Sequence, residues 1–134
     1  MKKWGLLVAL LLSAPSFAGG STTTKTLVDG CRAYNDIQDG TAEQKYGDDA
    51  LTFGKKSMGL GYCTGYINGF LSGYSAGSYG SEKKWYCLPR TVTADQISRV
   101  LIKRLDDRPE FEDMEPLPFM LAILSSTWPC PATP

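Results

Sequence analysis

A regular spacing of glycines in the middle of the chain constrains its fold more than any other feature. From Gly61 to Gly77 a glycine occupies every fourth position, within the uncharged run GYCTGYINGFLSGYSAG. Each glycine in a helix interior costs about 1 kcal/mol relative to alanine, so five of them at helical spacing require a compensating contact, such as close approach of another backbone. The spacing predicts a helix over about Met58 to Tyr79, with a glycine-rich loop as the alternative.

The predicted helix has two different faces. At about 100° per residue, one side gathers the apolar residues of a core face, namely Leu60, Cys63, Ile67, Leu71 and Tyr74. The glycines wind across the opposite side, which is flat enough to receive a helix of the same chain or of a second copy. The residues that we expect on this self-association face are Gly65, Gly69, Gly73, Tyr62 and Tyr66.

The N-terminal residues are typical of a secretory signal peptide. Lys2 and Lys3 precede an apolar stretch, and Ser16-Phe17-Ala18 forms a small-x-small cleavage site. The apolar stretch is shorter than the roughly 20 residues that a membrane span needs. We therefore expect residues 1–18 to be removed on export and residues 19–134 to form a single domain.

Apolar periodicity and capping signals predict the remaining helices. Thr93 and Gln96 form a capping-box pair, and Pro109 marks the end of the helix that they open. The other expected helices cover residues 24–38, a short turn at 42–46 within a long connection at 41–57, and residues 116–128. The chain is thus predicted to be all-α, a compact domain of four to five helices.

Four cysteines remain after the signal peptide, an even number that favours two disulfides in an oxidising compartment. Three pairings are open to them. Cys31 and Cys63 occupy the apolar faces of the first two helices, and Cys87 and Cys130 share one end if the last two long helices form an antiparallel hairpin. This layout favours pairing Cys31 with Cys63 and Cys87 with Cys130.

The residue types of the chain argue against an enzyme. It has no histidine, which removes the commonest general base and the commonest metal ligand, and its cysteines lack the CxxC spacing of zinc sites. We expect no catalytic residue, no metal and no cofactor. The enzymatic alternative is a pair of carboxylates, either Asp48 and Asp49 or two from the acidic stretch at residues 106–115. Without Lys2 and Lys3, twelve basic residues face fourteen acidic ones, so nucleic acid is not an expected partner.

The order of these signals resembles one family. A helix with a cysteine is followed by CTGYINGF, then CLP, a T-x-x-Q capped helix that ends in LDDRPE, and an apolar helix that closes on WPCP. This order is similar to that of the Rap/Tai family, periplasmic immunity proteins that neutralise peptidoglycan amidases delivered by type VI secretion systems. The resemblance implies a periplasmic, disulfide-bonded helical protein that works as a homodimer and blocks the cleft of a cysteine-dependent amidase.

In that family a loop between helices is understood to enter the effector's substrate groove. By position, the first candidate here is the acidic stretch Asp106, Asp107, Glu110, Phe111, Glu112, Asp113, Met114 and Glu115. An amidase cleft that binds the carboxylates of peptidoglycan stems is expected to be electropositive, which favours an acidic loop. The second candidate is Lys83, Lys84, Trp85 and Tyr86, and a merely solvated loop is the alternative for the acidic stretch.

Two other functions fit parts of the pattern. A small periplasmic helical chaperone shares the signal peptide and disulfides, and a glycine-zipper membrane-associated protein shares the small-xxx-small spacing. The polar Thr64, Asn68 and Ser72 would face lipid poorly, so we expect no stable membrane insertion.

Overall fold

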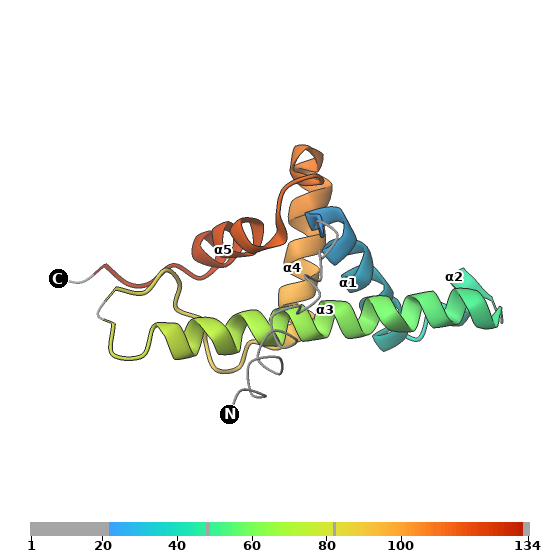
Figure 1. The fold of residues 1–134 in the computed structure, drawn as a ribbon, viewed down its shortest axis with the longest axis horizontal. Helices are drawn as coiled ribbons and strands as arrows, with labels where there is room; N and C mark the ends of the chain where they lie inside the picture. Colours follow the sequence, from blue (N-terminus) through green and yellow to red (C-terminus); the bar gives the residue numbers. More distant parts are fainter. Residues whose placement is uncertain (1–21, 48, 82, 133–134) are drawn as a thin grey trace, which may run out of the picture.

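The computed structural model describes residues 22–47, 49–81 and 83–132, and the predicted signal peptide lies outside them. In these ranges the chain forms only helices, turns and loops (Figure 1). The helices are α1 (Thr24–Gln38), α2 (Ala42–Tyr46), α3 (Ala50–Gly77), α4 (Ala94–Asp107), the 3₁₀-helix η2 (Pro109–Phe111) and α5 (Pro116–Thr127). The predicted all-α fold is confirmed.

Capping side chains fix the starts of α1, α3 and α4. The Thr93 hydroxyl accepts from the Gln96 amide at 3.3 Å, and the Gln96 side-chain oxygen accepts from the Thr93 amide at 3.0 Å. Both halves of the predicted capping box are therefore present at α4. Thr23 caps α1 in the same way, accepting from the Thr26 amide.

Helix α3 begins earlier than the sequence pattern predicts, at Ala50 instead of about Met58. The Asp49 carboxylate caps it by accepting from the Thr52 amide at 2.9 Å, so this carboxylate serves a structural role. Only Cys63 and Ile67 of α3 are buried. Because its first turns have no buried face, they carry no apolar period, and the segment resembles a loop in sequence.

The core lies where α1 packs between α3 and α4, and α5 covers one side of it (Figure 1). Its fully buried side chains include Leu27, Cys31, Ile67, Ile97, Leu101, Met120 and Leu124. The apolar stripes that predicted α1 and α4 thus meet in one continuous cluster, to which α3 contributes from its middle third.

The closest helix crossing lies at Gly30 of α1 and Gly59 of α3. A Cβ atom on Gly30 would stand 2.6 Å from the Gly59 carbonyl oxygen, so only glycine fits there. In contrast, Gly61, Gly65, Gly69, Gly73 and Gly77 have nothing within 4 Å of the position of a Cβ atom. The predicted close contact therefore forms beside the periodic run, and the run itself faces open space.

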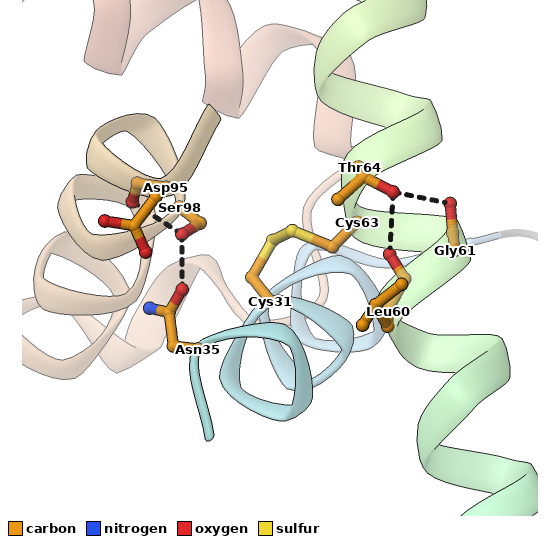
Figure 2. The surroundings of a disulfide bond; sticks show 8 residues. All are labelled: Cys31, Asn35, Leu60, Gly61, Cys63, Thr64, Asp95 and Ser98. Atoms are coloured by element: carbon orange, nitrogen blue, oxygen red, sulfur yellow. Dashed lines mark hydrogen bonds between the residues drawn. A yellow bond between two sulfur atoms is a disulfide. The ribbon is translucent and has the colours of Figure 1, made fainter. Parts of the chain in front are cut away.

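Two disulfides join the cysteines as predicted. Cys31 and Cys63 link α1 to α3 with an S–S distance of 2.05 Å, and Cys87 and Cys130 are linked at the same distance (Figure 2 shows the first bond). The second bond does not arise from an antiparallel hairpin, because α5 lies beside α4 at a steep angle to it (Figure 1). Instead, the Cys87 amide donates to the Trp128 carbonyl at 2.9 Å and brings the two segments together.

Candidate functional site

The acidic stretch, residues 106–115, begins with the last two residues of α4, contains η2 and ends just before α5. It forms the apex of the molecule, where the start of α1 meets it (Figure 1). The amides of Thr24 and Lys25 donate to the carbonyls of Met114 and Glu112 at 2.8 and 3.0 Å, and the Thr24 hydroxyl also donates to Met114. The first amides of a helix have no partner within it, so the start of α1 holds the acidic stretch in one conformation.

Aromatic packing provides a second anchor for the acidic stretch. The Phe111 ring lies 6.2 Å from the ring of buried Phe119, and the Arg108 guanidinium lies 5.3 Å from the Phe111 centroid. Phe111 is therefore half-buried and mainly structural. Met114 is 40% exposed and Leu117, in the first turn of α5, is 57% exposed, so these two offer apolar contact to a partner.

Half of the acidic groups are already paired. Asp106 bonds Arg32 of α1, Asp107 bonds Lys103 at 3.1 Å, and Glu110 bonds Arg108, whose hydrogen bond lowers the pKa of Glu110. Among the described residues, Glu112, Asp113 and Glu115 have no ion-pair partner. Their net negative charge is what the acidic stretch presents to another molecule.

The second candidate, residues 83–86, follows α3. Trp85 is 63% exposed and lies beside the exposed Lys83 and Lys84, whereas Tyr86 is only 5% exposed. Burial, together with the charge of Tyr74, raises the pKa of Tyr86 to about 12. The structure thus places three of these four residues at the surface and makes Tyr86 a support.

Stacked rings hold this second candidate in place. The Tyr86 ring lies 4.4 Å from Tyr74, whose hydroxyl accepts from the Trp85 amide at 2.6 Å. A hollow of about 400 Å³ lies beside them, lined by Leu71, Tyr74, Ser75, Ser78, Lys84, Tyr86, Cys87, Leu88 and Pro89. Trp85 is thereby presented on a fixed backbone.

The predicted self-association face is exposed only at its glycines, because Tyr62 and Tyr66 are half-buried and pack against the core. Gly65, Gly69 and Gly73 are exposed, and the rings of Tyr62 and Tyr66 pack 5.9 Å apart at a tilt. Burial raises the pKa of Tyr66, and the charges of Tyr62 and Glu115 add to this effect. The end of the acidic stretch is therefore within electrostatic reach of the middle of α3.

A third surface was not predicted. A hollow of about 520 Å³ opens where α1 ends and α2 and the first turns of α3 meet, lined by Ile37, Gly40, Ala42, Glu43, Tyr46, Gly47, Ala50, Phe53 and Lys56. Phe53 is 62% exposed. The sequence signal was an isolated apolar residue in a stretch that resembles a connection, too weak to indicate a surface.

Two further properties bear on the chemistry of the molecule. Across residues 22–47, 49–81 and 83–132, no cluster of three potential metal ligands occurs, and none of the helices found there has the length and apolarity to traverse a bilayer.

The acidic stretch forms a fixed, charged and partly apolar surface. Such a surface is suited to binding another protein.

The fold and this surface define a small helical protein that is cross-linked by two disulfides and has a surface for binding another protein. Residues 23–130 match the family model of the Rap1a immunity proteins, and the chain belongs to this family. No curated protein and no solved structure matches the chain significantly. Membership implies the non-enzymatic role of an immunity protein, which binds a cognate effector.

Proposed function

We propose that this protein is a periplasmic immunity protein of a type VI secretion system, which inhibits a peptidoglycan amidase effector by occluding its active-site cleft. The observation that carries the proposal is the anchoring of the acidic stretch by the start of α1, in a chain of an immunity family. The stretch is the part that enters the cleft.

The anchoring favours binding because the stretch is ordered before it meets its partner. Ordering a loop on association lowers affinity, and a preorganised loop avoids that cost. The unpaired Asp113 and Glu115 accelerate the encounter with an electropositive cleft, and Met114 fills an apolar position between them. The exposed Trp85 surface is the second proposed contact.

Export and self-association complete the proposal. Two disulfides require an oxidising compartment, and the periplasm is where a peptidoglycan amidase acts. The family resemblance implies a homodimer, and the exposed glycine face of α3 is the surface that we propose for it.

The test of this function starts from the neighbouring genes. Each protein encoded beside this chain is purified, assayed for cleavage of purified peptidoglycan and titrated with this protein. We expect one neighbour to cleave peptidoglycan and to lose activity at equimolar inhibitor. If no neighbouring amidase is inhibited, the proposed target is wrong.

The contact surface is tested by charge reversal. Asp113→Lys with Glu115→Lys should weaken binding to the inhibited amidase at least tenfold, about 1.4 kcal/mol, and should reduce the dependence of the association rate on salt. Glu43→Lys, with the same type of charge change on exposed α2, serves as the control and should bind normally. Equal affinities for all three proteins, measured by titration calorimetry, would move the site to Trp85.

A further inference from the structure

The exposed side of α3 divides into a half with large side chains and a half with small ones. At a spacing of 3 or 4 residues, the first half presents the exposed Leu51, Lys55 and Met58, and it is bordered by Tyr62, which is half-buried and also packs against the core. Leu51 is 68% exposed and Met58 is 77% exposed, so residues 22–47, 49–81 and 83–132 leave these apolar side chains largely uncovered. Large apolar groups at this exposure on one stripe indicate a surface that packs against a partner.

The second half continues the same stripe with Gly65, Gly69, Ser72 and Ala76, all of them exposed. Beyond Gly65 and Gly69 there is open space. Helices α1, α4 and α5 lie mainly on the other side of α3 (Figure 1). The small half therefore forms a flat strip that is long enough to receive side chains from outside.

The two halves are complementary when α3 is reversed. Reflection about the point between Cys63 and Thr64 places Met58 opposite Gly69 and Leu51 opposite Ala76. Tyr62 then faces Gly65, and Lys55 faces Ser72. Every large residue of the stripe meets a small one, which is the match that packing of side chains into spaces requires.

We infer that two copies of this chain pair through antiparallel α3 helices in this register. The inference rests on the self-association proposed above and adds its direction and alignment. A parallel pair would set Met58 against Met58 and Lys55 against Lys55, while glycine would face glycine across a void. Reversal instead brings Lys55 towards the carbonyl end of the partner's α3, where a positive charge is favoured.

Single cysteines test the direction, because all four native cysteines are in disulfides. Gly65→Cys lies close to the twofold axis, so its two copies should join on mild oxidation. Two copies of Ala76→Cys would stand about 37 Å apart along the helices and should remain unlinked. Efficient linking through residue 76, or none through residue 65, overturns the inference.

The masses of the protein and one variant in solution test the pairing itself. The wild type should sediment as a dimer, and Gly69→Leu should be a monomer, with dissociation at least tenfold easier. Leucine at this exposed helix position leaves the fold intact, which an unchanged melting temperature verifies. A monomeric wild type or a dimeric Gly69→Leu overturns the inference, and because no effector is used, neither result bears on amidase inhibition.

Discussion

At the scale of single residues, Asp36 organises the end of α1. Its side chain is 14% exposed and accepts hydrogen bonds from Lys45 and Tyr46 of α2 and from Thr41. Burial raises the pKa of Asp36, but these donors outweigh burial and the net shift is downward. Tyr46 in turn lies under Lys56 of α3, 4.2 Å from its ammonium, so one carboxylate ties three helices together.

Replacement of Asp36 by asparagine should lower the free energy of unfolding at pH 7 by about 1 to 2 kcal/mol, because hydrogen bonds to a charged group are lost. The unfolded aspartate titrates at about pH 3.9 and the folded one at a lower pH. The extra stability of the wild type over Asp36→Asn is therefore fully present above the pKa of the unfolded aspartate. It disappears as the pH falls through the pKa of Asp36 in the folded protein.

Thermal unfolding followed by circular dichroism between pH 2.5 and 7 measures this difference. Asp39→Asn is the control, since Asp39 pairs with Arg99 at the exposed surface, where solvent screens the pair and its contribution to stability is small. If the stability difference between the wild type and Asp36→Asn were constant with pH, the ionised form of Asp36 would not be what holds α2 against α1.

At the scale of elements, a glycine in α1 is required for packing, whereas a glycine in α3 only lowers helix propensity. Gly30 permits the crossing of α1 over α3, where its Cα lies 3.2 Å from the position of a Cβ on Gly59. Gly54, on the exposed first part of α3, has nothing within 4 Å of its Cβ position. Identical substitutions at the two positions therefore separate packing from helix propensity.

Gly30→Ala should destabilise the protein by about 1 to 3 kcal/mol, because a backbone carbonyl cannot move away from the added methyl group. Gly54→Ala should stabilise it by up to about 1 kcal/mol through helix propensity alone. Urea unfolding of both variants gives the two values. Equal signs would contradict the close crossing at Gly30.

At the scale of the whole molecule, two disulfides hold a small core. They join residues 32 and 43 positions apart, and the loss of unfolded-chain entropy for loops of these lengths stabilises the fold by about 4 kcal/mol per bond. Cys31 and Cys63 are completely buried, whereas Cys87 and Cys130 are half-buried. The two bonds therefore differ in access to solvent.

A limiting amount of reductant should open the bond between Cys87 and Cys130 first, because thiol attack requires access to the sulfur. Alkylation and peptide mass spectrometry should then find these two cysteines labelled while Cys31 and Cys63 stay protected until global unfolding. If all four cysteines were labelled at one rate, the buried bond between Cys31 and Cys63 would be as accessible to reductant as the bond between Cys87 and Cys130.

The sequence by itself determined the features that depend on near neighbours. The α4 capping box, the apolar stripes of α1 and α4 and the bond between Cys31 and Cys63 follow from residues a few positions apart or from the apolar faces of single helices. Signals of this kind are local, since helix starts and faces are set within one or two turns.

Only the tertiary structure decided which surfaces stay free. The pairing of Asp106 with Arg32 spans 74 positions and removes one charge from the acidic stretch, in which Glu112, Asp113 and Glu115 stay unpaired. The close helix contact forms at Gly30 instead of along the periodic glycines, and α3 extends beyond its predicted start. These outcomes depend on how distant segments pack, and a local pattern carries no information about a partner that the fold brings from elsewhere in the chain.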